Sequence, residues 1–91
     1  MKNEKGEPAS ISGLMEAHEI TAEDVHRAID TYLAVPTTGV FPLGSRYNLN
    51  LAKAVRAQPE AYNSILNPKV RWVLKREAVR KAILSARPEK R

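Results

Sequence analysis

Apolar residues recur at helical spacing along most of this chain. The clearest stripe is predicted between positions 25 and 33, where residues at i, i+3, i+4, i+7 and i+8 would share one face of a helix: Val25, Ala28, Ile29, Tyr32 and Leu33. Thr21 precedes the stripe as a capping residue, and Asp24 stands three positions on, as in a capping box. This helix should end before Pro36, because proline biases the preceding residue out of helical geometry.

Shorter patterns predict two more helices around this one. A first helix is expected from about Ser10 to His18, with one face made of Ile11, Leu14, Met15 and His18. We expect His18 to be half-buried packing at the end of that face. A third helix, with Leu51, Ala52 and Val55 in its apolar face, should begin at a cap supplied by Asn48 or Asn50 and close at Pro59.

The C-terminal third predicts a helical pair. Pro59 can occupy the first turn of a short fourth helix that runs through Leu66. Asn67 and Pro68 repeat the signal of a cap followed by proline, and a long fifth helix should then reach about Ala86.

The fifth helix is expected to cover the core with one broad side made of Trp72, Leu74, Ala78, Val79, Ala82 and Ile83. Arg71 and Lys75 fall inside that side. Their charged groups must either reach past the apolar residues to water or contact something outside the domain.

The segment 36–47 contains two prolines and two glycines and predicts an ordered loop, with a short extended piece as an alternative. We expect three apolar side chains of this loop to pack into the core: Val40, Phe41 and Leu43. The predicted fold is all-α, a compact bundle of four to five short helices in a single domain over 9–87. We expect a disordered tail at 1–8 and a basic tail at 88–91.

Composition limits the class of protein. A chain of 91 residues forms one domain with a modest core. It contains no cysteine, which excludes disulfides and thiolate chemistry and favours a cytoplasmic location. The polar N-terminus lacks the apolar run of a signal peptide, and no apolar stretch is long enough for a membrane helix, so no membrane partner is expected.

Charge is strongly segregated within a net charge of +5. Acids dominate residues 1–34, whereas cations dominate 67–91, where only Glu77 and Glu89 oppose them. A basic segment of this density suggests a polyanionic partner, although lysine and arginine late in a helix also suit its dipole and solubility.

No set of residues predicts catalysis, a metal or cofactor site, or a small-molecule substrate. His18 and His26 fall on different helices without metal-ligand spacing, and His26 should be solvated. Residues 39–46 resemble a phosphate-binding loop superficially, but serine follows the second glycine where lysine is needed, and Pro42 removes an amide. Glu23 and Asp24 fit ordinary partners of a helix dipole. We therefore expect no enzymatic activity.

Two segments have the spacing of a helix-turn-helix. The first, Ser10 to Leu33, would present Glu23 and Asp24 to phosphate, which like charge disfavours. The second, Pro59 to Ala86, opens its second helix with cations where base contacts are made in such motifs. Its candidate nucleic-acid contacts are Lys69, Arg71, Lys75, Arg76, Arg80 and Lys81.

Two functional hypotheses follow from these patterns. The first is a DNA-binding accessory protein, for instance in transcription regulation, that works as a homodimer through the basic helix. Double-stranded DNA is favoured over RNA because few aromatic residues are available for stacking. The alternative is a protein-interaction module, such as an adaptor, an enzyme inhibitor or an antitoxin-like partner, that docks through its charged helices. Residues 10–34 would then supply self-association or a protein contact.

Overall fold

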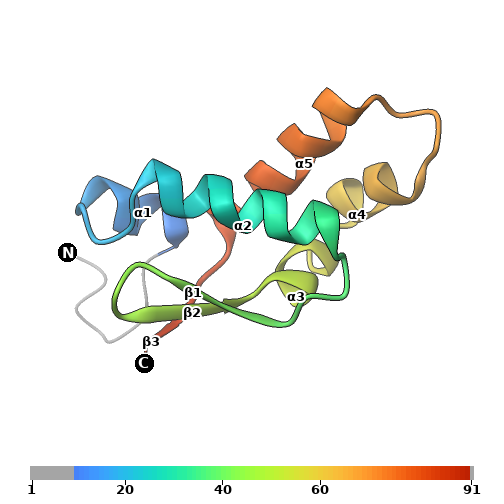
Figure 1. The fold of residues 1–91 in the computed structure, drawn as a ribbon. Helices are drawn as coiled ribbons and strands as arrows, with labels where there is room; N and C mark the ends of the chain where they lie inside the picture. The colour runs from blue at the N-terminus through green and yellow to red at the C-terminus, as the bar shows by residue number, and fades with distance from the viewer. Residues whose placement is uncertain (1–9, 91) are drawn as a thin grey trace.

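The computed structural model describes residues 10–90, so the tail expected at 1–8 and the final residue of the basic tail lie outside the described part. Within this range the chain forms five helices and a three-stranded antiparallel sheet (Figure 1). In chain order the elements are α1 (Ile11–Glu16), α2 (Ala22–Ala34), β1 (Val40–Leu43), β2 (Tyr47–Asn50), α3 (Leu51–Arg56), α4 (Pro59–Leu66), α5 (Trp72–Ser85) and β3 (Glu89–Lys90).

The all-α prediction is therefore wrong, because the expected Pro/Gly loop contains a β-hairpin. Strands β1 and β2 pair in antiparallel register from Val40↔Asn50 to Leu43↔Tyr47. The turn between them, residues 44–46, begins with Gly44 in a left-handed conformation, with a φ of 65°, which glycine adopts without the steric cost of a side chain. Proline lacks an amide hydrogen, so it is tolerated on edge strands, and Pro42 lies on the edge strand β1. Prolines and glycines are typical of loops, so the composition of this segment predicts a loop although two of its stretches form strands.

The sheet is completed by residues that the sequence placed in the basic C-terminal tail. Strand β3 pairs with β2 through Tyr47↔Lys90 and Asn48↔Glu89, which gives the order β1-β2-β3. Pro88, just before it, is fully buried. Two residues carry too little pattern to predict a strand, and the pairing arises from packing between distant parts of the chain.

Helix α2 confirms the strongest sequence prediction. The Thr21 hydroxyl accepts a hydrogen bond from the Asp24 amide at 3.1 Å, and the Thr21 amide donates to the Asp24 carboxylate at 3.1 Å. These reciprocal bonds satisfy amides that a helix leaves unpaired at its start. The cap of α3 is Asn50, whose side chain accepts from the Lys53 amide at 3.0 Å, and α4 starts at Pro59 as predicted.

Helix α1 is shorter than predicted and ends at Glu16. His18 follows in a left-handed conformation, with a φ of 64°, and its side chain is exposed. The prediction that His18 packs at the end of the apolar face is therefore wrong. Histidine is among the non-glycine residues that more often adopt this conformation, and here it reverses the chain toward α2.

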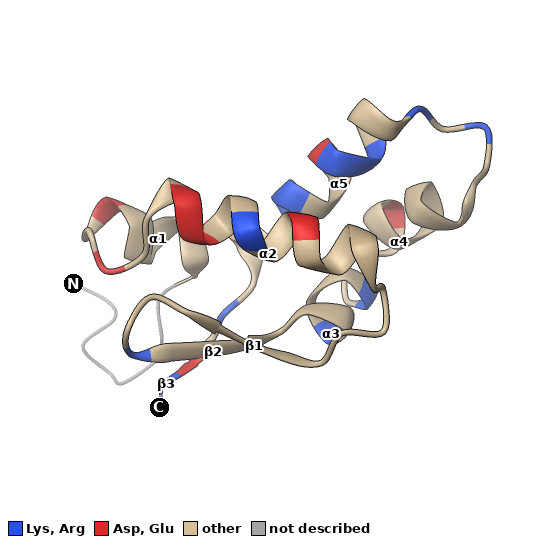
Figure 2. Cartoon of the chain, in the orientation of Figure 1, with Lys and Arg blue, Asp and Glu red and all other residues tan. Residues whose placement is uncertain are grey.

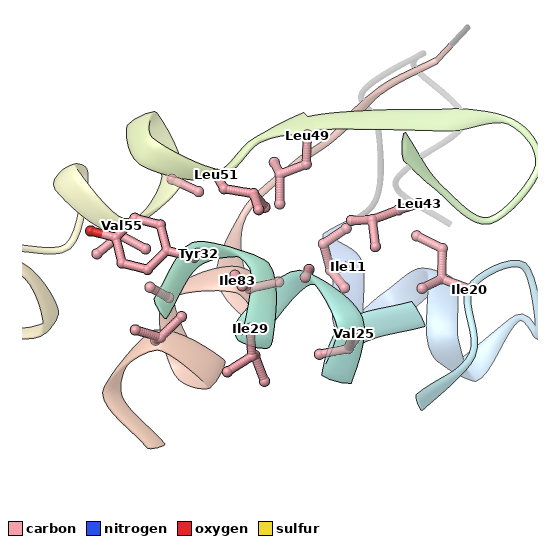
Figure 3. Close-up of a cluster of buried hydrophobic side chains, with 14 of the residues drawn as sticks. Ile11, Ile20, Val25, Ile29, Tyr32, Leu43, Leu49, Leu51, Val55 and Ile83 are labelled. Carbon is pink, nitrogen blue, oxygen red and sulfur yellow. The ribbon is translucent and has the colours of Figure 1, made fainter. Parts of the chain in front are cut away.

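The core lies between α2, the hairpin and the C-terminal half of α5 (Figure 3). It collects apolar side chains from all five helices, from β1 and β2, and from the turn between α1 and α2: Ile11, Leu14, Ile20, Val25, Ala28, Ile29, Tyr32, Leu43, Tyr47, Leu49, Leu51, Ala54, Val55, Ala61, Val79, Ala82 and Ile83. Leu43 is buried and Phe41 packs against this cluster as expected, whereas Val40 points to solvent with 64% exposure.

The molecule is elongated, with extents of 42 × 22 × 20 Å. One end holds α1, whose Ile11 amide donates to the Ala86 carbonyl just after α5 at 2.9 Å. At the other end the N-terminal part of α5 and its connection to α4 project beyond α2 (Figure 1). The C-terminal half of α5 is thus built into the core and its N-terminal half is not.

Candidate interaction surface at the α4–α5 end

Helix α5 begins later than the sequence predicts, at Trp72 with Arg71 as its N-cap. The Asn67 side chain accepts a hydrogen bond from the Lys69 amide at 2.9 Å, and the Asn67 carbonyl accepts from the Val70 amide at 3.1 Å. Such local bonds of asparagine compete with helical ones. The expected cap and first turn therefore form a five-residue connection between α4 and α5.

Large apolar side chains gather on both sides of this connection and remain exposed. Four of the six large exposed apolar residues among 10–90 belong to this region, and we call them the apolar end: Leu66 (62% exposed), Trp72 (59%), Val73 (68%) and Leu74 (58%). The prediction that Trp72 and Leu74 cover the core is therefore wrong, because α5 extends past the elements that bury its C-terminal half.

The apolar residues surround the start of α5 and do not form a stripe along one side. Consecutive residues of a helix point about 100° apart, so Trp72, Val73 and Leu74 face three directions. A helical segment that is apolar on several sides is ordinarily buried, yet each of these three side chains is more than half exposed within residues 10–90. The sequence carries this signal in the three consecutive apolar residues 72–74, whereas helical periodicity accounts only for Trp72 and Leu74.

The six predicted nucleic-acid contacts are all present on or before α5, but they divide into groups. Lys69 and Arg71 are exposed beside the apolar end, and Lys75 lies one turn further along, partly buried. No ion pair within residues 10–90 involves these three.

The other three cations lie further from the apolar end. The Arg76 guanidinium donates to the Asp30 carboxylate of α2, so its charge is opposed within the molecule. Arg80 lies 3.7 Å from Glu77 of its own helix. Lys81 follows Arg80 directly and therefore faces another side, where it lines the groove between α4 and α5. The six cations thus do not form one continuous surface.

This geometry departs from a helix-turn-helix. Such motifs join their helices through three or four residues, whereas the connection here has five. The first turn of the second helix should present hydrogen-bonding side chains to base edges. Here it presents Trp72 and Val73, and Arg76 on the next turn is bound to Asp30.

Helices α1 and α2 carry most of the acids. Cations lie on α5 and its connection, and also on α3, in the hairpin turn and next to β3 (Figure 2). We call Glu16, Glu19, Glu23 and Asp30 the acidic face, since all four residues are exposed. Within residues 10–90, Arg76 is the one cation in an ion pair with this face.

Two open cavities accompany these surfaces. The groove between α4 and α5 has a volume of about 480 Å³ and includes Val70, Leu74 and Lys81 in its wall. A second cavity of about 420 Å³ lies where β2 and α3 meet the end of α5, with Asn48, Asn50 and Lys53 among its lining residues. Neither is enclosed, and neither contains a nucleophile paired with a base.

Residues 10–90 contain no cluster of three or more histidine, aspartate or glutamate side chains placed to hold a metal ion. None of the helices in this part of the chain has the length and apolarity to cross a bilayer. Comparison with family models, with curated proteins and with solved structures found no match to this chain.

One contact links the acidic face to the hairpin. The Tyr47 hydroxyl donates to the Glu19 carboxylate at 3.2 Å. Burial raises the pKa of Tyr47 above 10.0, and the negative charge of Glu19 raises it further. Burial likewise raises the pKa of Tyr32.

These shifts predict a loss of stability at alkaline pH. A phenol whose pKa is higher in the folded state keeps its proton longer there, so its stabilising effect is complete below pH 10.0 and disappears as pH rises through the folded value. We expect the melting temperature to fall above about pH 10. Tyr47→Phe removes one titrating group and should reduce the slope. An equal slope in both proteins would contradict the assignment.

Proposed function

We propose that this protein is a protein-interaction module that docks on its partner through the apolar end of α4 and α5. The observation that carries the proposal is the start of α5, which is apolar on three sides and uncovered within residues 10–90. Contiguous exposed apolar residues mark interaction sites more often than chance exposure does. Aromatic anchors such as Trp72 are also enriched among residues that dominate binding energy.

The flanking charges define the partner further. Lys69, Arg71 and Lys75 bring three positive charges to the edge of the apolar end, and no ion pair within the described residues neutralises them. Burying an unpaired charge is costly, so a partner should place carboxylates opposite these cations. We propose an acidic protein surface with an apolar depression, and a non-enzymatic role in a cytoplasmic setting, where a chain without cysteine is common.

A specific observation also keeps nucleic-acid binding as a second proposal. Lys69 and Arg71 stand at the start of α5, where the backbone amides of the first turn have no side-chain cap. Phosphate is attracted to such a helix start. In this case the contact would be electrostatic and independent of sequence, so binding should weaken steeply with salt.

Matched variants separate the two proposals. Trp72→Ser with Val73→Ser removes the centre of the apolar end, and Val40→Ser is the control because Val40 is 64% exposed on the remote strand β1. Wild-type protein and both variants are immobilised, exposed to lysate of the source cells, and the captured proteins are quantified. Each captured protein is then purified and titrated directly.

We expect the double variant to weaken direct binding by roughly 30-fold or more, since anchors of this kind contribute at least about 2 kcal/mol. The control should bind like the wild type. If both variants bind a partner equally well, the docking proposal is contradicted. Retention on a labelled DNA duplex that falls with salt, and that Lys69→Ala with Arg71→Ala removes, would support the second proposal.

A further inference from the structure

We infer that a second copy of this chain is a partner of the apolar end, in a two-fold pair in which the apolar end of each copy lies on the acidic face of the other. This inference rests on the proposed docking function and adds the identity of one partner. It is carried by the charge distribution along the molecule.

The two ends of one copy are electrostatically complementary. Within residues 10–34 five carboxylates face a single cation, Arg27, which pairs with Asp24 at 3.3 Å. At the other end, Lys69, Arg71 and Lys75 border the apolar residues. Opposite charges at close approach fix the orientation of two proteins more than they add affinity, and here they orient one copy antiparallel to the next.

The same contact already exists once within the molecule. Arg76 of α5 donates to Asp30 of α2 and so joins the cationic helix to the acidic helix. The acids of α1 and α2 extend this face away from the start of α5 (Figure 2). No ion pair involving Glu16, Glu19 or Glu23 is formed within residues 10–90. Glu16 and Glu23 are therefore available to the cations of another copy, whereas the Glu19 carboxylate already accepts a hydrogen bond from Tyr47.

Charge also decides against the simpler arrangement in which two apolar ends meet. That pairing would bring Lys69 and Arg71 of one copy against the same residues of the other, and like charges at an interface oppose association. The antiparallel arrangement removes this conflict. Ala17 and Ala22 are exposed among the acids and leave room for large apolar side chains to approach.

A closed pair also makes the contact twice. A two-fold axis repeats every interaction, so each copy contributes both an apolar end and an acidic face. Stable interfaces bury about 1,200–2,000 Å² in total, so each of the two equivalent contacts has to bury only half of that area. The extents of 42 × 22 × 20 Å let two contacts form at opposite ends without sharing residues.

Charge exchange tests the arrangement. One variant reverses the acidic face with Glu16→Lys and Glu23→Lys, and the other reverses the apolar end with Lys69→Glu and Arg71→Glu. Each alone should pair at least about tenfold more weakly than the wild type, because both contacts then join like charges. Mixed together they should form a heterodimer of near wild-type affinity, since both contacts again join opposite charges.

The readouts are sedimentation equilibrium and the emission of Trp72, the one tryptophan of the chain, over roughly 1 μM to 1 mM protein. The inference predicts a monomer–dimer equilibrium with a blue shift of Trp72 emission on pairing. A wild type that stays monomeric overturns it, as does pairing of the acidic-face variant at wild-type strength, which would mean that two apolar ends meet.

The experiments distinguish a failure of the self-pairing inference from a failure of the proposed docking function. A monomeric wild type that still binds a purified partner, and loses it with Trp72→Ser and Val73→Ser, overturns the self-pairing alone. A blue shift with phosphatidylserine vesicles but not with rising protein concentration also overturns it and assigns the apolar end to lipid.

Discussion

Replacing Ile83 by alanine is expected to destabilise the domain by about 2–5 kcal/mol, the range for large-to-small changes in a core. Ile83 is fully buried in the cluster that joins α5 to the rest of the fold. Domains of this size are stable by roughly 5–10 kcal/mol, so the loss removes a large share of stability. Chemical denaturation followed by circular dichroism measures it.

Val73→Ala is the matched control for this change. It also removes methyl groups from an apolar residue of α5, but from a side chain that is 68% exposed. Measured at the lowest practical protein concentration, its free energy of unfolding should stay within about 0.5 kcal/mol of the wild type. If the two variants lose equal stability, α5 is not buried at one end and exposed at the other.

Gly44→Ala is expected to destabilise the fold by about 2 kcal/mol or more. Gly44 has a φ of 65°, a conformation that costs an L-residue about 1–2 kcal/mol. An added Cβ would also lie 2.6 Å from the backbone carbonyl oxygen of Glu19. The turn between α1 and α2 would have to move away from the hairpin.

Gly39→Ala serves as the comparison, because a Cβ there meets no atom within 4 Å. Its unfolding free energy should be unchanged or higher by up to about 1 kcal/mol, since alanine restricts the unfolded chain. Thermal melting of both variants tests the pair. Equal losses at the two glycines would show that the hairpin does not pack against the α1–α2 turn as described.

The helices could be predicted from the sequence where local signals agreed. Thr21 and Asp24 start α2 and Asn50 caps α3 through hydrogen bonds within a few residues. Pro59 opens α4 through its fixed backbone angle, which suits the first turn of a helix. Such signals are readable because both partners are close in sequence. The same reasoning explains why α2, with its regular apolar stripe, was predicted most accurately.

The hairpin could not be predicted in the same way. Phe41 and Leu43 on β1 alternate with exposed positions, and Tyr47 and Leu49 on β2 alternate with partly buried ones. Four residues give a short pattern, however, and Pro42 interrupts it. The third strand forms only because residues 89 and 90 pair with β2, which lies about 40 positions earlier in the sequence. Long-range pairing of this kind leaves little local signal.

The candidate site was predicted in its charge and missed in its apolar character. Periodicity assigned Trp72 to the core, because its position continues the face of Val79 and Ile83. Whether that face is covered depends on where the neighbouring helices end, which no local pattern records. The exposure of Lys69 and Arg71 could be predicted without knowing where the neighbouring helices end, since lysine and arginine are exposed almost everywhere.

Site-specific photocross-linking in cells tests the docking claim most directly. A photoreactive residue is placed at position 73, within the apolar end, or at position 40 on β1, which is exposed to a similar extent, 64% against 68%. Docking through the apolar end predicts covalent adducts with protein from position 73 and a far lower yield from position 40. Equal yields from both positions, or adducts with nucleic acid alone from position 73, would contradict it.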